Sequence, residues 1–134
     1  MGSATAWMDK RFYPEHRQNW DDWLLRERIL AQIKPGSVVL DLGAGAGIVE
    51  QMDFRGLGAR VCGVDLDPRV VDNPMLDEGR VADAGRIPYP GAMFDVVFCD
   101  NVLEHLETPA IVFKEIWRVL KPGGRFSSMD PWRA

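Results

Sequence analysis

The sequence predicts an α/β fold in which a parallel sheet is covered by helices on both faces. The first observation is that strand-like and helical patterns alternate along the chain. The second is the composition of the 134 residues, 46% hydrophobic and 27% charged, which suits one globular domain with a self-sustaining core. We expect a single domain over 1–134, made of an N-terminal segment and helix (1–35) and a core (36–130).

The first part of the chain predicts a helix, a strand and a second helix. Trp20, Trp23 and later apolar residues recur near helical spacing, which favours a core position for both tryptophans, and the Lys-Pro-Gly stretch at 34–36 should end this helix. A buried strand follows at 37–42. The glycine-rich turn after it should open a helix that runs through Met52 to the next glycines.

The middle of the chain predicts a second and a third strand. Residues 60–64 predict a strand, and Asp67 and Pro68 can cap and begin a helix after it. This helix should be short because Pro74 interrupts it. A weaker strand is expected near 80–82.

The C-terminal part predicts a loop, two strands and a helix. Residues 87–91 are proline-rich and predict a loop, 94–99 form the clearest strand, and 101–106 should form a helical turn. A proline can begin a helix over 110–120, and a last strand is expected at 125–129. The side chains expected to face the sheet from this helix are Ile111, Ile116, Val119 and Leu120.

Charge and cysteine usage exclude several classes of function. The net charge is −4 and no lysine or arginine cluster occurs, so we expect no nucleic-acid partner. Cys62 and Cys99 lie in apolar strand-like runs, which predicts buried, reduced thiols, and the two histidines have no ligand spacing, so we expect no metal. No stretch approaches the ~20 apolar residues of a membrane span, nor does a signal peptide begin the chain, which predicts a cytoplasmic protein with no membrane contact.

The stretch at 38–47 reads Val-Val-Leu-Asp-Leu-Gly-Ala-Gly-Ala-Gly, a buried strand followed by three alternating glycines. Glycine turns of this kind commonly bind phosphates, but the carboxylate of Asp41 would repel a pyrophosphate. The dinucleotide fingerprint also fails, because Ile48 stands where its third glycine should be. The turn therefore favours a positively charged ligand, and S-adenosylmethionine, with an ammonium group, a sulfonium and no phosphate, fits that description.

Two further acidic residues end the next two predicted strands. Asp65 lies 24 residues after Asp41 (65 − 41) and can accept both hydroxyls of a ribose, an offset that the nicotinamide site shares. Asp83 follows the third predicted strand. Ligands of open α/β sheets bind beyond the carboxyl ends of the strands, where these three carboxylates should converge.

Residues 41–47 resemble the first motif of the class I S-adenosylmethionine-dependent methyltransferases. The likeness extends over 21–129 and includes the stretches 94–106 and 114–124. Within that class it resembles the group that includes the ubiquinone and menaquinone biosynthesis methyltransferases and many small-molecule methyltransferases. This implies a three-layer, Rossmann-like, doubly wound sheet with strand order 3-2-1-4-5, and methyl transfer to a small-molecule acceptor.

The resemblance also implies a binding site for S-adenosylmethionine and its product S-adenosylhomocysteine. The implied positions are Asp41, Gly43, Ala44 and Gly45 for the methionine part, Asp65 for the ribose, Leu66 for the adenine face, Asp83 and Ala84 for the adenine edge, and Asn101 for the sulfonium end. His105 is a candidate catalytic base, with packing or a structural role as the alternative.

The family's sheet normally continues past strand five, whereas here only five residues follow it. We expect strands six and seven to be lacking and the edge of strand five to be open, which would allow a homodimer through that edge. The alternatives to an enzyme are a catalytically silent S-adenosylmethionine-binding or interaction module, or a fragment that needs a partner to complete its sheet. A nicotinamide-dependent oxidoreductase is disfavoured by Asp41 and Ile48.

Overall fold

The computed structural model describes residues 15–100 and 106–129. It contains a five-stranded parallel sheet with the order β3-β2-β1-β4-β5, which confirms the expected strand order. The strands are β1 (Val38–Leu42), β2 (Arg60–Asp65), β3 (Glu78–Val81), β4 (Phe94–Asp100) and β5 (Leu120–Met129). The α-helices are α2 (Glu15–Leu30) and α3 (Pro109–Val119), and the 3₁₀ helices are η1 (Glu50–Met52) and η2 (Pro68–Asp72).

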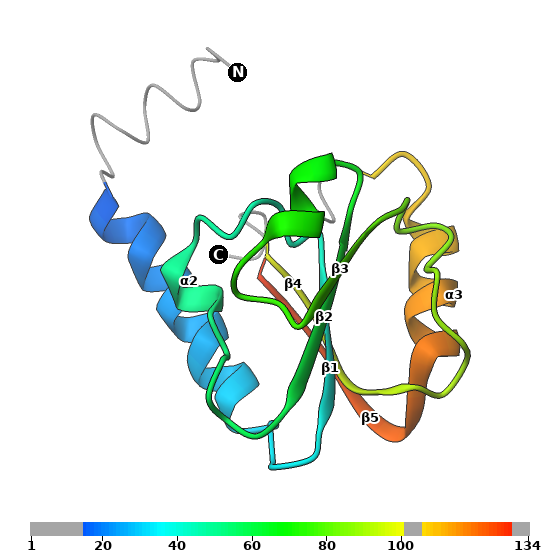
Figure 1. The fold of residues 1–134 in the computed structure, drawn as a ribbon, viewed down its shortest axis with the longest axis horizontal. Coiled ribbons are helices and arrows are strands. Elements are labelled where there is room, and N and C mark those ends of the chain that lie inside the picture. The colour runs from blue at the N-terminus through cyan, green and yellow to red at the C-terminus, as the bar shows by residue number, and fades with distance from the viewer. Residues whose placement is uncertain (1–14, 101–105, 130–134) are drawn as a thin grey trace.

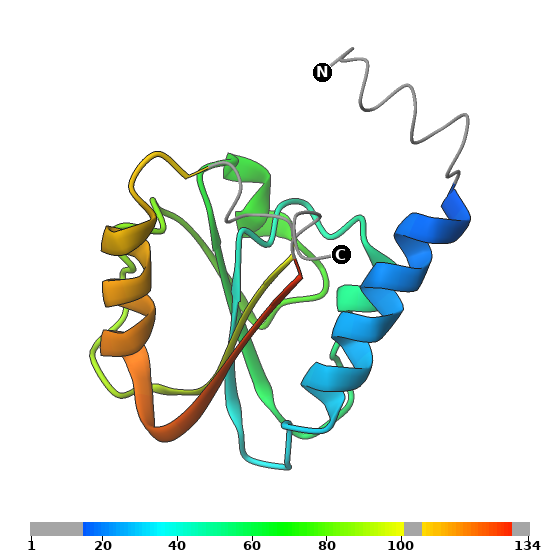
Figure 2. The same ribbon diagram turned by 180° about the vertical axis from the view of Figure 1, so that it is seen from behind.

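The described elements form three layers, with α2 on one face of the sheet and α3 on the other (Figure 1). The view from behind gives the same arrangement (Figure 2). Side chains of a strand point alternately to opposite faces, so each central strand supplies both cores. In β1, Val39 belongs to the cluster under α2, whereas Leu40 and Leu42 belong to the cluster under α3.

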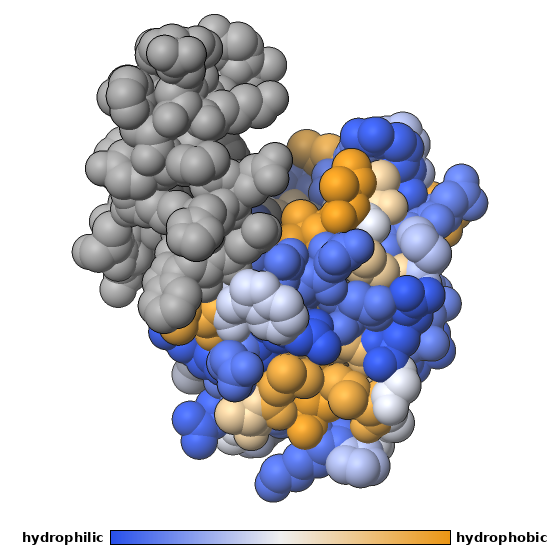
Figure 3. All heavy atoms as spheres, turned by 90° about the vertical axis from the view of Figure 1, so that its left-hand side faces the viewer, coloured by the Kyte–Doolittle hydropathy of each residue, from blue (hydrophilic) through white to orange (hydrophobic). Residues whose placement is uncertain are grey.

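The outer face of the α2 side is chemically mixed, with hydrophobic areas between hydrophilic ones (Figure 3).

On α2 the buried apolar positions are Leu25 and Ile29, four residues apart. The expected core position of Trp23 is wrong, because this side chain is 51% exposed. Two residues from Leu25 along a helix, it points away from the buried stripe. The side chain of Trp20 lies outside the described part.

The prediction of a helix after the glycine turn is also wrong, because only the single 3₁₀ turn η1 forms there. The Arg26 guanidinium donates hydrogen bonds to the backbone oxygens of Gln51 (2.8 Å) and Asp53 (2.7 Å). Asp53 itself is extended, with φ −91° and ψ 111°. A contact with α2 thus takes the place of helical hydrogen bonding after η1.

The short helix after β2 follows its prediction. The Asp67 carboxylate accepts a hydrogen bond from the Arg69 amide at 2.9 Å, and Pro68 occupies the first turn. The element ends before Pro74, as expected. The loop at 87–91 is also confirmed.

The helix α3 begins and ends close to its predicted bounds, but its buried stripe is shifted. Ile111 is 51% exposed, whereas Val112 is buried in its place. Val112, Ile116 and Val119 follow the i, i+4, i+7 spacing of one helix face, and Ile111 lies about 100° away from it. The last strand starts at Leu120, five residues earlier than predicted, because an irregularity in the β4–β5 register accommodates the Pro-Gly-Gly stretch.

Within the ranges 15–100 and 106–129, Cys62 and Cys99 are buried and reduced, as predicted. In the same ranges, the helices are all too short or too polar to cross a membrane.

Substitution of the two isoleucines of α3 tests which face of this helix is buried. Ile116→Ala should lower the free energy of unfolding by about 2–5 kcal/mol, because Ile116 is only 2% exposed. Ile111→Ala, on the same helix, should change it by no more than about 0.5 kcal/mol. Urea unfolding of both variants measures the difference, and equal losses would contradict the assignment of the buried face.

Candidate functional site

The glycine turn after β1 folds over the end of β2. The backbone amides of Gly43 and Ala44 both donate to the carbonyl oxygen of Val64, at 2.8 and 3.1 Å. Gly45 and Gly47 have φ values of +60° and +81°, in the left-handed region that glycine adopts without strain. The turn is therefore held against the neighbouring strand instead of leading straight into a helix.

Asp65, the last residue of β2, connects this turn with the loop that follows β2. Its Oδ2 accepts a hydrogen bond from the Gly45 amide at 2.7 Å, and its Oδ1 accepts one from the Asp67 amide at 2.9 Å. A carboxylate oxygen has two lone pairs, so both oxygens of Asp65 can still accept a bond from a ligand hydroxyl.

Asp41 is a buried carboxyl group near the end of β1, only 7% exposed. Among the described side chains, none forms an ion pair with it. Burial, and secondarily the charge of Asp65, raise the pKa of Asp41 to about 8. The carboxyl group is therefore mainly protonated at neutral pH, and a cation placed beside it would favour its ionised form.

A cavity of about 240 Å³ opens beside Asp41. It is lined by Asp41, Gly43, Ala44, Gly45, Ala46, Gly47, Ile48, Val49, Met52, Arg69, Asn73, Met75 and Asp100. The cation of this lining, Arg69, pairs with Asp67 at 2.6 Å. The cavity thus combines a buried carboxyl group, backbone amides and apolar side chains, a lining that suits a small ligand carrying positive charge.

The predicted site residues divide into two groups. Asp41, Gly43, Ala44 and Gly45 line the cavity together. The others in the described part, which do not line it, are Asp65, Leu66, Asp83 and Ala84. Asn101 and His105 lie outside the described residues.

The group outside the cavity lies around the ends of β2 and β3. Asp65 contacts the cavity wall through Gly45, and its backbone oxygen accepts a bond from Ala82 at 3.0 Å. Leu66 is 70% exposed. The Asp83 carboxylate accepts a bond from the Gly85 amide at 3.0 Å and is exposed. These side chains extend the candidate site from the cavity across the outer strands.

Three residues with polar side chains in the lining were not predicted. Asp100 ends β4 as Asp41 nearly ends β1, so the rule that ligands bind at strand ends could have identified it. Arg69 lies within the short helix η2 and Asn73 directly follows it, and no spacing in the sequence distinguishes them.

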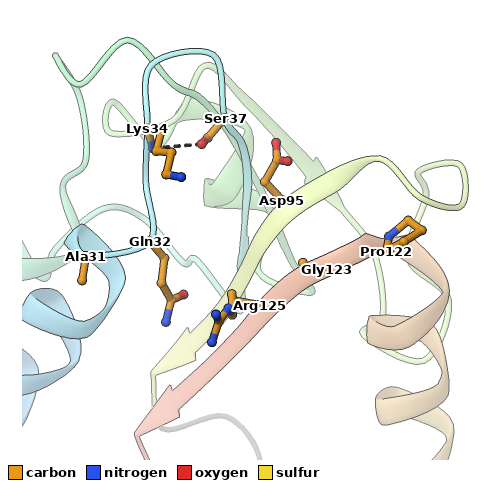
Figure 4. A pocket seen from close by; sticks show the side chains of 9 residues that line it. Ala31, Gln32, Lys34, Ser37, Asp95, Pro122, Gly123 and Arg125 are labelled. Atoms are coloured by element: carbon orange, nitrogen blue, oxygen red, sulfur yellow. Dashed lines mark hydrogen bonds between the residues drawn. The ribbon is translucent and has the colours of Figure 1, made fainter.

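A second cavity, of about 350 Å³, lies where β1 begins (Figure 4). Its lining includes Lys34, Ser37, Asp95 and Arg125. Asp95 is already engaged, because its carboxylate accepts the Val38 amide at 2.8 Å and pairs with Lys121 at 3.2 Å. Ligands of open α/β sheets bind at the opposite, carboxyl ends of the strands, so we place the candidate site in the smaller cavity.

Comparison with known proteins identifies related chains. The family described as "Methyltransferase domain" matches residues 40–128. A ubiquinone biosynthesis O-methyltransferase of Paraburkholderia phytofirmans is 38% identical over 137 residues, which cover 90% of this chain and 56% of the relative. Phosphoethanolamine N-methyltransferase 1 of Zea mays is 34% identical over 106 residues, covering 73% of this chain and 21% of the relative.

Solved structures show the same fold. A phosphoethanolamine N-methyltransferase 2 of Haemonchus contortus, in complex with phosphomonomethylethanolamine and S-adenosylhomocysteine, has a TM-score of 0.66 and 28% identity, covering 80% of this chain and 27% of that one. A SAM dependent methyltransferase from Aquifex aeolicus has a TM-score of 0.63 and 24% identity, covering 78% of this chain and 63% of that one. The chain spans less than two thirds of each of these proteins.

The raised pKa of Asp41 predicts a pH-dependent cost to folding. Between its ordinary value of 3.8 and about 8, the unfolded chain ionises this group while the folded chain keeps the proton, so stability falls as pH rises through that window. Asp41→Asn removes the titration. Its free energy of unfolding should rise relative to wild type by up to about 1.4 kcal/mol for each pH unit between pH 5 and 7.

Asp53→Asn is the matched control for this experiment. Hydrogen bonding to Arg55 lowers the pKa of Asp53. The stability that this bond adds to the folded protein is therefore fully present above the ordinary pKa of 3.8 and does not change between pH 5 and 7. Urea unfolding should therefore give a difference from wild type that is constant between pH 5 and 7. A constant difference for Asp41→Asn as well would show that Asp41 is ionised in the folded protein.

Proposed function

Because the chain belongs to the methyltransferase domain family, we propose that it binds S-adenosylmethionine and transfers the methyl group to a small-molecule acceptor. The observation that carries this proposal is the buried Asp41 carboxyl group, which has no cationic partner among the described residues and lines the cavity. A buried carboxylate is strongly unfavourable without a counter-charge. S-adenosylmethionine offers an ammonium group and a sulfonium, and no phosphate that Asp41 would repel.

The surrounding residues supply the other contacts of the proposed site. Asp41 would face the positive charge of the methionine part, beside Gly43, Ala44 and Gly45 of the turn. Asp65 keeps lone pairs for the ribose hydroxyls while it holds the turn.

The adenine end of the proposed site lies outside the cavity. Leu66, 70% exposed, offers apolar surface for the adenine face. Asp83 and Ala84, after β3, would take the adenine edge, and Asn101 the sulfonium end.

When bound, S-adenosylmethionine supplies a methyl group on a sulfonium, whose leaving group departs as a neutral thioether. The chain's task is then to align the acceptor and exclude water. Ile48, Val49 and Met52 give the cavity an apolar side that serves this purpose. A base is needed only where the acceptor must lose a proton, and His105 stays a prediction for that role.

The acceptor is proposed as a small molecule on the names of the relatives, which are a ubiquinone biosynthesis O-methyltransferase and a phosphoethanolamine N-methyltransferase. The second candidate is a binding module without turnover. It is favoured by the outer edge of β5, which among the described strands pairs only with β4. Such an edge can pair with another strand, and pairing of two copies there stays a prediction, as does a cytoplasmic location.

Calorimetry with S-adenosylmethionine, S-adenosylhomocysteine and NAD tests the proposed ligand. We expect micromolar binding of the first two and none of NAD. Asp65→Asn should weaken binding about 10- to 100-fold, because it removes charge from bonds worth about 1.5–3 kcal/mol. Asparagine keeps the size of the side chain and one of its two acceptor oxygens, so the variant also loses one of the bonds that Asp65 accepts from the Gly45 and Asp67 amides.

Asp53→Asn, on the surface beside Arg55, controls for the loss of one negative charge and should bind like wild type. Binding of NAD alone would favour the oxidoreductase. A folded chain that binds neither sulfur compound would refute the proposed cofactor.

A further inference from the structure

We propose that Asn73 is a positioning residue that holds the glycine turn in the shape that receives the amino-acid part of S-adenosylmethionine. This inference rests on the function proposed above. Asn73 follows η2 and lines the cavity, and it is only 6% exposed. No pattern in the sequence indicated a role for it.

The side chain of Asn73 links two loops that are distant in sequence. Its Nδ2 donates to the backbone oxygens of Ala44 at 3.2 Å and Gly45 at 3.1 Å. Its Oδ1 accepts a hydrogen bond from the Met75 amide at 2.9 Å. The Asn73 Nδ2 group thus bonds to the glycine turn, while Oδ1 bonds to the loop that contains Asn73 itself.

Gly45 is held at both of its backbone polar groups. Its amide donates to Asp65 at 2.7 Å, and its carbonyl oxygen accepts from Asn73 at 3.1 Å. Two residues on, a Cβ at Gly47 would lie 2.5 Å from Oδ1 of Asn73, so the turn approaches Asn73 too closely for any larger residue. Asp65 and Asn73 therefore hold the backbone of the turn at two points, the amide and the carbonyl oxygen of Gly45.

The bonds of the Gly43 and Ala44 amides to Val64 hold the start of the turn, and the bonds with Asp65 and Asn73 hold it further along, at Ala44 and Gly45. Glycine loses more conformational freedom than any other residue when it is fixed. The helix that usually follows such a turn is reduced here to η1, which begins only at Glu50. A turn fixed before the ligand arrives spares the ligand that ordering cost, so the bonds of Asn73 should raise affinity by pre-organisation.

Two variants of Asn73 isolate the proposed role. Asn73→Asp keeps an acceptor for the Met75 amide but loses the donor to the turn, whereas Asn73→Ala loses both. Ser127→Ala is the control, because Ser127 is also buried and hydrogen-bonded, to Gln32 at 3.1 Å, but does not line the cavity.

The readout is binding of two ligands, S-adenosylhomocysteine and 5′-methylthioadenosine, which share the nucleoside and sulfur but differ in the amino-acid part. Both Asn73 variants should bind S-adenosylhomocysteine about tenfold more weakly and 5′-methylthioadenosine within about twofold of wild type, in line with the loss of one to two hydrogen bonds at the turn. Ser127→Ala should leave both affinities unchanged.

Hydrogen exchange of the ligand-free chain gives a second readout that does not depend on the cofactor. Amides of residues 43–47 should exchange faster in both Asn73 variants, and not in Ser127→Ala. If Asn73→Ala does not fold, Asn73→Asp provides the same comparison.

The outcomes separate the two proposals. A wild-type chain that binds neither ligand refutes the proposed function, while faster exchange in the Asn73 variants still supports the role of Asn73 in holding the turn. Equal losses for both ligands, or unchanged affinities and exchange, would overturn the positioning role of Asn73.

Discussion

Burial of the Asp41 carboxyl group, which has no cationic partner among the described residues, opposes folding, and the candidate site depends on this arrangement. The parallel pairing of β1 with β2 places Asp41 opposite Gly63, two residues before Asp65. Repulsion from Asp65 adds to the effect of burial, and together they raise the pKa of Asp41 to about 8. The sheet itself thus creates a place where positive charge is favourable.

The rest of the fold holds Asp41 and the glycine turn in position. Alternation along β1 sends Val39 to the α2 core and Leu40 and Leu42 to the α3 core, so the strand is buried on both faces and fixed in position. Beyond its end, the backbone of the turn is held by Asp65 at the amide of Gly45 and by Asn73 at its carbonyl oxygen. The sheet fixes the position of the Asp41 carboxyl group, and the side chains of Asp65, at the end of β2, and Asn73, after η2, fix the backbone of the turn beside it.

The sequence was sufficient for the sheet because β1, β2 and β4 are mainly apolar, with few charged residues, which is typical of buried parallel strands. It was insufficient where tertiary contacts decide local structure. The helix after the glycine turn is replaced because Arg26, about 25 residues earlier, takes the carbonyl oxygens there. Asn73 was missed for a similar reason, since its partners are backbone atoms 28 and 29 residues away.

The claim that Asp41 receives a cation is tested most directly by the protons released on binding. Calorimetry at pH 6.5, in two buffers of different ionisation enthalpy, measures that number for S-adenosylmethionine. Since Asp41 has a pKa of about 8 before binding, we expect wild type to release close to one proton and Asp41→Asn to release none. Tight binding to wild type without proton release would contradict this claim, because the charge of Asp41 would then not respond to the ligand.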